Sequence, residues 1–215
     1  MRLERRFFGD RRGGGLLTVL SYTFSKTFEA NHRLNNWNLA EPPVHELSNY
    51  DKPSNLAFSG VWDLPFGNRR AFLSGGNSVV RAIVSDWNYN WVFTYNAGYP
   101  TAWPDAVFSC SSYIVPNETH EQWFNNDTSC WKGRPAYTLR DTGDRFAWIR
   151  NPGRSNVNMT IARTFRLSER YSLQLRGESF NTTNTPMFGG PNTSYTDPRF
   201  GKLPIAQQNF PRLVQ

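Results

Sequence analysis

The sequence has no long hydrophobic run. Only 38% of its 215 residues are hydrophobic, and it has no stretch of about 18 uncharged apolar residues, the minimum for a membrane-spanning helix. Residues 1–15 are rich in arginine and lack the apolar core of a signal peptide. A membrane-spanning helix is therefore excluded. We expect a chain that is either cytoplasmic or lacks its N-terminal part.

Motifs that carry chemistry are also absent. The sequence contains no G-x-S-x-G, P-loop or H-E-x-x-H string, so nucleophilic, nucleotide-dependent and metalloprotease chemistry lack support. The three histidines, His32, His45 and His120, fall in predicted loops, and none has a second ligand at metal spacing. We therefore expect no enzyme, no cofactor and no metal site.

Only two cysteines are present, Cys110 and Cys130, and both lie in one long polar segment. Without a C-x-x-C pair, a zinc site is not expected. A disulfide between them would close a loop of about 20 residues and contribute on the order of 3 kcal/mol. It would suit an oxidising compartment. Two unrelated free thiols are the alternative.

Aromatic residues and turn formers are plentiful instead: 15% of the residues are aromatic, and there are 16 glycines and 14 prolines. The clearest pattern is the alternation in residues 87–98. One row contains Trp87, Tyr89, Trp91, Phe93 and Tyr95, and the other contains Asn88, Asn90, Thr94 and Asn96. Because side chains alternate across a strand, this pattern predicts a strand with one apolar face.

The same alternation recurs in residues 16–26, 55–64, 157–167 and 171–180, and a sixth strand is expected to begin near Phe210. Gly60 interrupts the apolar row of the second segment. Residues 1–14 are expected to form a leading turn or partial strand. We predict an all-β fold, an antiparallel up-and-down meander of about six strands.

The connections differ strongly in length. About 28 residues follow the first strand, about 22 the second, over 55 the third, about three the fourth and about 29 the fifth. The long connections thus follow the first, third and fifth strands. Outer-membrane barrels place long loops on the outside of the membrane and short turns on the inside. The second connection is long for an inner turn, so residues 79–84 are expected to lengthen the third strand. The pattern predicts a partial transmembrane β-barrel with long extracellular loops, including residues 101–153.

A barrel strand has one side toward lipid and one toward the lumen. We assign the lipid side to Tyr22, Phe24, Phe58, Trp62, Trp87, Tyr89, Trp91, Phe93 and Tyr95, and the lumen side to Asn88, Asn90, Arg176 and Glu178. Arg176 and Glu178 lie two apart, so they share a side, which favours an ion pair over acid–base catalysis. Arg163 falls on the apolar side, and we expect it near the membrane surface with its stem snorkelling.

Residues 101–153 are rich in aromatic side chains. One hypothesis is that exposed rings stack on a ligand at the cell surface, and its candidates are Trp103, Trp123, Phe124, Trp131 and Trp148. The alternative, which we favour, is that the rings pack the loop against itself or form the upper aromatic girdle of a barrel.

The charge balance is basic, with 24 lysines and arginines against 17 acidic residues and a net charge of +7. Five arginines near the start would suit nucleic acid: Arg2, Arg5, Arg6, Arg11 and Arg12. The other arginines are scattered through loops, and the aromatic residues follow strand patterns. We therefore expect no nucleic-acid partner. Instead, we expect the basic side chains to face water or lipopolysaccharide.

Several short strings together resemble a known family. They are SYTFSK at 21–26, YDKP at 50–53, LPFG at 64–67, GYP at 98–100, RGESFN at 176–181, NTPMFG at 184–189 and FGK at 200–202. In this order they resemble the C-terminal barrel of TonB-dependent outer-membrane receptors, in the Oar-like branch whose members carry a carboxypeptidase-regulatory-like domain. The resemblance runs from about residue 15 to residue 215.

The resemblance implies a 22-stranded barrel in the outer membrane, with a plug in its lumen and energy supplied by TonB, that takes up an unidentified substrate. This sequence has about six strands and neither plug nor TonB box, so residues 1–215 are expected to be a C-terminal fragment. Its expected partners are outer-membrane lipid and lipopolysaccharide, the missing strands and plug, and TonB through that plug. The alternatives are a secreted β-sandwich carbohydrate-binding module and a surface adhesin barrel that transports nothing.

Overall fold

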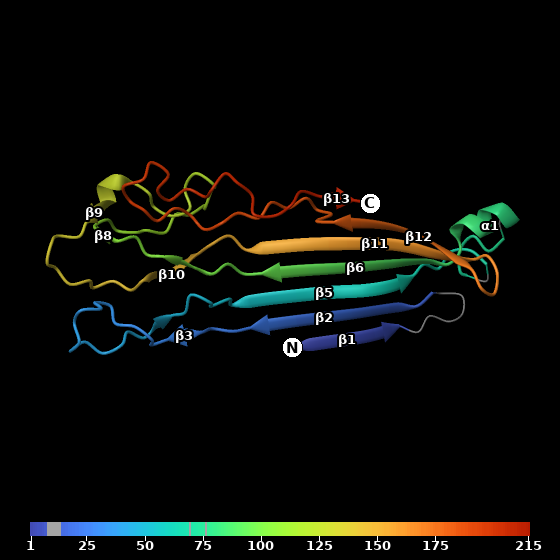
Figure 1. Cartoon of the computed structure of the whole chain (residues 1–215), viewed down its shortest axis with the longest axis horizontal. Helices are drawn as coiled ribbons and strands as arrows, with labels where there is room; N and C mark the ends of the chain where they lie inside the picture. The colour runs from blue at the N-terminus through green and yellow to red at the C-terminus, as the bar shows by residue number, and fades with distance from the viewer. Residues whose placement is uncertain (8–13, 69, 76) are drawn as a thin grey trace.

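The computed structural model describes residues 1–7, 14–68, 70–75 and 77–215. Its main feature is one antiparallel sheet of seven strands in the order β1-β2-β5-β6-β11-β12-β13 (Figure 1). The strands are β1 (Arg2–Phe7), β2 (Leu16–Phe24), β5 (Ser54–Asp63), β6 (Trp87–Asn96), β11 (Arg154–Arg166), β12 (Ser172–Phe180) and β13 (Leu213–Val214). Each strand pairs with its predecessor in this series, which confirms the predicted up-and-down meander.

Three long loops gather at one end of the sheet, opposite the end that carries α1 (Ser78–Val84) (Figure 1). We call them the first loop (residues 25–53), the second loop (97–153) and the third loop (181–212). They contain three small two-stranded sheets and one 3₁₀ turn. These are β3 (Phe28–Glu29) with β4 (Glu46–Leu47), β7 (Pro100–Ala102) with β10 (Arg145–Arg150), β8 (Ala106–Phe108) with β9 (Trp131–Gly133), and η1 (Thr128–Cys130).

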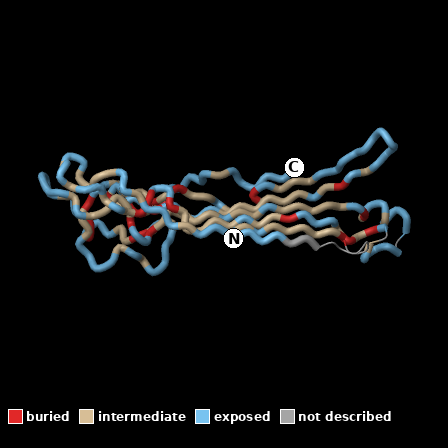
Figure 2. Tube along the Cα trace, turned by 90° about the horizontal axis from the view of Figure 1, so that it is seen from below, coloured by how far each residue is buried: buried red, intermediate tan, exposed pale blue. Residues whose placement is uncertain are grey.

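The seven-stranded sheet is a single layer. Among the described residues, the buried hydrophobic side chains belong to the loops and none to this sheet: they are Leu47, Ala106, Phe124, Cys130, Trp131, Phe146, Ile149, Phe200 and Leu203. Figure 2 shows most of the buried positions at the loop end. A sandwich would bury alternate residues of two packed sheets, so the sandwich alternative is wrong.

The strand register brings the apolar rows onto one face. Leu20 pairs with Phe58, Phe58 with Phe93, and Phe93 with Val157. A slip of one residue would reverse the side of every side chain in a strand. The pairing therefore joins the separate apolar rows into one continuous surface, which we call the apolar face, and the opposite one is the polar face.

Gly60 interrupts the apolar row because Trp91 occupies the space beside it. The two residues are direct cross-strand partners, and a Cβ at Gly60 would lie 2.1 Å from Trp91 Cζ2. The indole also packs against its neighbours on the same face, with ring centroids 5.8 Å from Phe58 and 5.6 Å from Tyr89. The glycine therefore gives the large ring room to lie across the neighbouring strand.

One expectation about strand ends is wrong. Residues 78–84 form helix α1 instead of lengthening β6: the Asn77 side chain accepts a hydrogen bond from the Val80 amide, and Asp86 takes a positive φ of 61° before β6 begins. A helix cap and a left-handed residue thus override the strand preference of the valines and isoleucine. The last strand covers only Leu213–Val214, close to the expected start near Phe210, and Arg2–Phe7 form a strand within the leading segment for which we expected a turn or partial strand. The remaining leading residues, 8–13, lie outside the described part of the chain.

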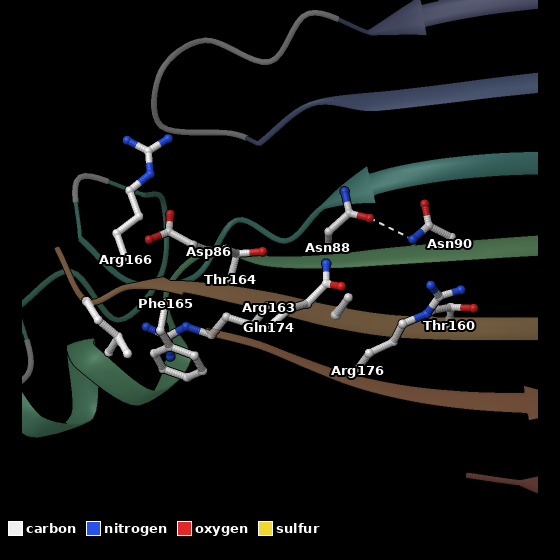
Figure 3. Close-up of a pocket in the computed structure, with 12 residues that line it drawn as sticks. Asp86, Asn88, Asn90, Thr160, Arg163, Thr164, Phe165, Arg166, Gln174 and Arg176 are labelled. Atoms are coloured by element: carbon white, nitrogen blue, oxygen red, sulfur yellow. Dashed lines mark hydrogen bonds between the residues drawn. The ribbon is translucent and has the colours of Figure 1, made fainter. Parts of the chain in front are cut away.

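Arg163 lies beside α1, at the end of the sheet that carries this helix (Figure 3). It is only 8% exposed, its Nη1 donates to the Ile83 carbonyl of α1 at 2.6 Å, and its guanidinium lies 4.2 Å from the centre of the Phe165 ring. The helix covers this charge and supplies an acceptor. No helix among the described residues is long and apolar enough to span a membrane.

We expect Gly60→Ala to destabilise the sheet by about 1–3 kcal/mol, because the new methyl group forces Trp91 out of its position. Urea unfolding of the protein in outer-membrane vesicles measures this. Gly177→Ala is the matched control: Gly177 lies in β12 on the same face, and its Cβ would meet Ile161 Cγ2 at an ordinary 3.6 Å. Equal stability of the two variants would contradict the explanation.

Candidate functional site

The apolar face carries all nine side chains that we assigned to lipid. Residues Tyr22, Phe24, Phe58, Trp62, Trp87, Tyr89, Trp91, Phe93 and Tyr95 share it with the aliphatic residues of β11 and β12. Several large side chains on it are exposed, such as Phe24, Leu173 and Leu175. No second layer within the described chain covers this surface, so it is available to an apolar environment.

The polar face carries hydrogen-bonded amides and charges. Asn90 donates to Asn88 at 2.7 Å, and Asn88 donates to Asp63, also at 2.7 Å. On β12, Arg176 forms an ion pair with Glu178. The four residues that we assigned to the lumen therefore share one face. They form two contacting pairs there, Asn88 with Asn90 and Arg176 with Glu178.

A hollow of about 1070 Å³ lies on this side, near the end that carries α1 (Figure 3). Its lining includes Asn88, Asn90, Thr160, Gln174 and Arg176 from three adjacent strands. Groups of this kind offer hydrogen bonds to water or to a polar protein surface. The polar face thus differs chemically from the apolar one along the same strands.

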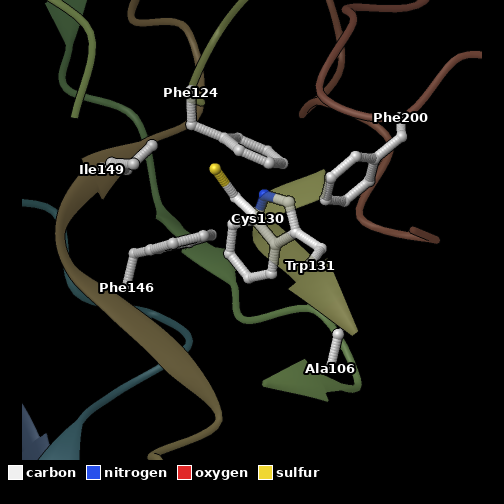
Figure 4. Close-up of a cluster of buried hydrophobic side chains, with 7 residues drawn as sticks. All are labelled: Ala106, Phe124, Cys130, Trp131, Phe146, Ile149 and Phe200. Atoms are coloured by element: carbon white, nitrogen blue, oxygen red, sulfur yellow. The ribbon is translucent and has the colours of Figure 1, made fainter. Parts of the chain in front are cut away.

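The hydrophobic core of the chain lies in the loops. The second loop contributes most of it, and Phe200 of the third loop completes it (Figure 4). We call this set the loop cluster: Ala106, Phe124, Cys130, Trp131, Phe146, Ile149 and Phe200. Ring centroids lie 5.2 Å apart for both Phe124–Phe146 and Phe124–Phe200. Aromatic packing therefore joins two loops that are far apart in the sequence.

Four of the five aromatic ligand candidates are part of this packing. Phe124 and Trp131 are buried within the loop cluster, and Trp103 and Trp123 pack against it. The Trp123 indole donates to the Arg150 carbonyl and the Trp131 indole to the Asn125 carbonyl, both at 2.7 Å. The rings of Phe124 and Trp131 are covered, so they offer no stacking surface to a ligand, in agreement with the alternative that the loop packs against itself.

Trp148 differs from the other four candidates. It lies in β10 and is 75% exposed. Regular alternation would place it on the same side as the buried Phe146, but the pairing of β10 with β7 is irregular between Arg145 and Arg150, and Phe146 and Ile149 are the buried residues of this strand. It is the candidate whose ring remains accessible at the loop end.

A disulfide joins Cys110 to Cys130. Cys130 ends the short turn η1, whose Asp127 cap accepts the Ser129 amide at 2.9 Å. The bond closes a segment of 20 residues and ties it to the buried side of the loop cluster.

The first and second loops are joined by a buried carboxylate. Asp51 is 0% exposed, and it accepts hydrogen bonds from the Thr27 amide at 2.6 Å and from Arg150 Nη2 at 2.5 Å. Arg150 also donates to the carbonyls of Asp51 and Gly98. This arginine therefore connects the end of the first loop to both ends of the second.

A surface ion pair joins the second and third loops. Lys202 Nζ lies 2.7 Å from Glu121 Oε2, and this hydrogen bond and charge hold the pKa of Glu121 below its ordinary value. Burial instead raises the pKa of the nearby Glu118. The Trp123 amide adds a backbone hydrogen bond to the Gly201 carbonyl at 2.8 Å. All three loops thus form one connected assembly.

The structure brings together three groups that sequence spacing did not relate. His32 Nε2 lies 3.1 Å from Glu46 Oε1 and 2.9 Å from Asp144 Oδ2. The sequence showed no second ligand at metal spacing for His32, whereas the fold places two carboxylates beside it. The reason is that Asp144 comes from the second loop, so no local motif contains the set.

A family model described as an outer membrane beta barrel domain matches residues 3–215. No curated protein matches the chain, and no solved structure matches it.

Replacing both cysteines, Cys110→Ser with Cys130→Ser, should lower the local stability of the second loop by on the order of 3 kcal/mol, because the open segment regains chain entropy. Limited proteolysis should then cut faster within residues 97–153 while the sheet persists. Reduction of the unaltered chain is expected to reproduce the effect, and reduction of the double variant to add nothing. Unchanged cleavage rates would contradict a stabilising disulfide.

Asp51→Ala should loosen the contact between the first two loops. The Thr27 amide and the Arg150 guanidinium lose a buried acceptor, at a cost of about 1–3 kcal/mol. Hydrogen exchange followed by mass spectrometry should show faster exchange in residues 25–53. Glu121→Ala removes a carboxylate from an exposed pair and serves as the control, with exchange there unchanged. Equal effects of the two variants would argue against the buried contact.

Proposed function

Because the chain belongs to the outer membrane beta barrel domain family, we propose that its seven-stranded sheet is a section of the wall of an outer-membrane transporter barrel. The family places the chain in the outer membrane. The observation that carries the proposal is the single-layer sheet, with a continuous apolar face and an opposite face of amides and charges. Lipid suits the first face and a lumen suits the second.

Closure of the barrel requires further strands. Single-chain bacterial barrels have at least eight, and a sheet in hydrocarbon needs every backbone group paired. The described strands form an open sheet with β1 and β13 at its edges. We propose that additional strands, outside residues 1–215, pair with these edges, so that this segment is the C-terminal part of a larger barrel.

The finer proposal is TonB-dependent uptake. It is supported by the resemblance in residues 21–26, 176–181 and 184–189 and by the hollowed polar face, whose Asn, Thr, Gln and Arg groups suit a plug in the lumen. In this proposal TonB acts through the plug, lipid and lipopolysaccharide surround the wall, and the substrate is unidentified. The role is not enzymatic and involves no nucleic acid, in keeping with the scattered arginines.

A second candidate is a surface adhesin barrel that transports nothing. The observation that favours it is the disulfide-bonded loop assembly with Trp148 exposed on it, because an ordered surface of this kind suits contact with a partner. The two candidates differ in what lies against the polar face: a plug for the transporter, and water for the adhesin.

A photo-cross-linking residue at each face tests the proposal in the native outer membrane. Placed at Asn90, on the polar face, it should form cross-links to protein, the plug. Placed at Phe93, three residues further along the same strand but on the apolar face, it should react with lipid alone.

The possible outcomes separate the candidates. Protein cross-links at Phe93 as strong as those at Asn90 would overturn the assignment of the apolar face to lipid. Lipid at Phe93 with no protein at Asn90 would keep the barrel wall, remove the plug and favour the adhesin.

A further inference from the structure

Three potential metal ligands meet where the first and second loops touch. His32 lies between β3 and β4, Glu46 begins β4, and Asp144 immediately precedes β10. Their ligand atoms all lie within 4.8 Å of one another. One imidazole and two carboxylates is a donor set that suits zinc and similar divalent transition metals.

The two ring nitrogens of His32 have different neighbours. Nδ1 lies 2.9 Å from Asn31 Oδ1, and the Asn31 amide is oriented by its nitrogen, which donates to Glu29 Oε2. An amide oxygen only accepts, so Nδ1 is the donor in this contact, and Nε2 is the ring nitrogen that faces the two carboxylates. A hydrogen bond at the other nitrogen is the usual support of a metal-binding histidine.

His32 Nε2 is buried and makes no hydrogen bond. It nevertheless faces Asp144 Oδ2 at 2.9 Å and Glu46 Oε1 at 3.1 Å. One imidazole nitrogen and two carboxylate oxygens therefore point at the same small space, where a cation would contact all three. With metal–ligand bonds near 2.0 Å in a tetrahedron, ligand atoms are about 3.3 Å apart, so small shifts would accommodate the ion.

The two carboxylates are held in place by groups behind them. Arg140 lies 2.5 Å from Asp144 Oδ1, which leaves Oδ2 toward His32. Glu46 Oε2 accepts the Asp144 amide at 2.8 Å, and Arg145 binds Glu46 Oε1 at 2.8 Å. A carboxylate oxygen has a second lone pair, so Glu46 Oε1 keeps a position for a metal. Such outer contacts orient metal ligands.

The charge around the site is negative despite the arginines. Arg145 also contacts Glu29 Oε1 at 3.4 Å, so three carboxylates face two guanidinium groups. A divalent ion reverses this balance by supplying the missing positive charge.

We propose that His32, Glu46 and Asp144 bind one divalent transition-metal ion, of which Zn²⁺ fits best, and that the ion cross-links the first and second loops. The fourth position is taken by water, as is usual for three-ligand zinc sites. The site lies in the loops, away from the seven-stranded sheet, so the ion arrives from the solvent on that side. This binding is separate from the proposed transport.

Equilibrium dialysis of the purified full chain against Zn²⁺ tests the site. The unaltered chain should bind one Zn²⁺ per chain, and His32→Gln should weaken that binding by at least about 10-fold. His45→Gln is the matched control: His45 lies in the same loop and stacks on Phe28 with ring centroids 5.2 Å apart, away from the three ligands. It should leave Zn²⁺ binding unchanged.

A second variant and a second measurement guard against misfolding. Asp144→Asn keeps the size of the side chain and an acceptor for Arg140, and it should also weaken Zn²⁺ binding. Zn²⁺ should slow tryptic cleavage after Arg33 and Arg140 in the unaltered chain embedded in outer-membrane vesicles, but not in either variant. Binding that is equal in the unaltered chain and both variants, or lost equally in His45→Gln, would overturn the proposal, as would cleavage that Zn²⁺ does not slow.

Discussion

The antiparallel hydrogen-bond ladder is the constraint on which this structure depends. In hydrocarbon an unpaired backbone group costs several kcal/mol, so a spanning sheet must satisfy its groups between strands. Here β2, β5, β6 and β11 each have a neighbour on both sides. The same ladder sets the register, and the register decides which side chains share a face. One set of backbone contacts thus produces both an apolar surface and a polar one, with no buried core between sheets.

The loops are stabilised by different interactions. Where the strands end, the chain forms a core of its own from packed aromatic rings, a disulfide and the buried Asp51–Arg150 pair. The Asp51–Arg150 pair joins residues 99 apart in the chain, the disulfide joins residues 20 apart, and together with the packed rings they hold the three loops together at one end of the sheet. The molecule therefore combines a sheet with no core and a loop assembly built around one, and the candidate metal site lies where the first two loops meet.

The strands were predictable to a large extent, and the loops were not. Period-two alternation of large apolar and small polar residues located β2, β5, β6, β11 and β12 within a few residues, because alternation is a local property of a strand. The same reasoning predicted a strand for residues 78–84, which form a helix. The helix cap at Asn77 and the left-handed backbone of Asp86 outweigh the strand preference of the β-branched side chains there. Aromatic residues in the second loop were recognised, but Phe124 and Trp131 were candidates for ligand contact and are buried instead.

The sequence by itself determined the class of the sheet, the sides of its strands and the concentration of aromatic residues in the second loop. Each follows from the order of neighbouring residues. Only the tertiary structure decided that Trp91 lies over Gly60, that Arg163 is covered by α1 and that Phe200 completes the loop cluster. Only it placed His32 beside Asp144. The physical reason is the same in each case: these contacts join residues distant in the chain, and no local spacing encodes where two loops meet.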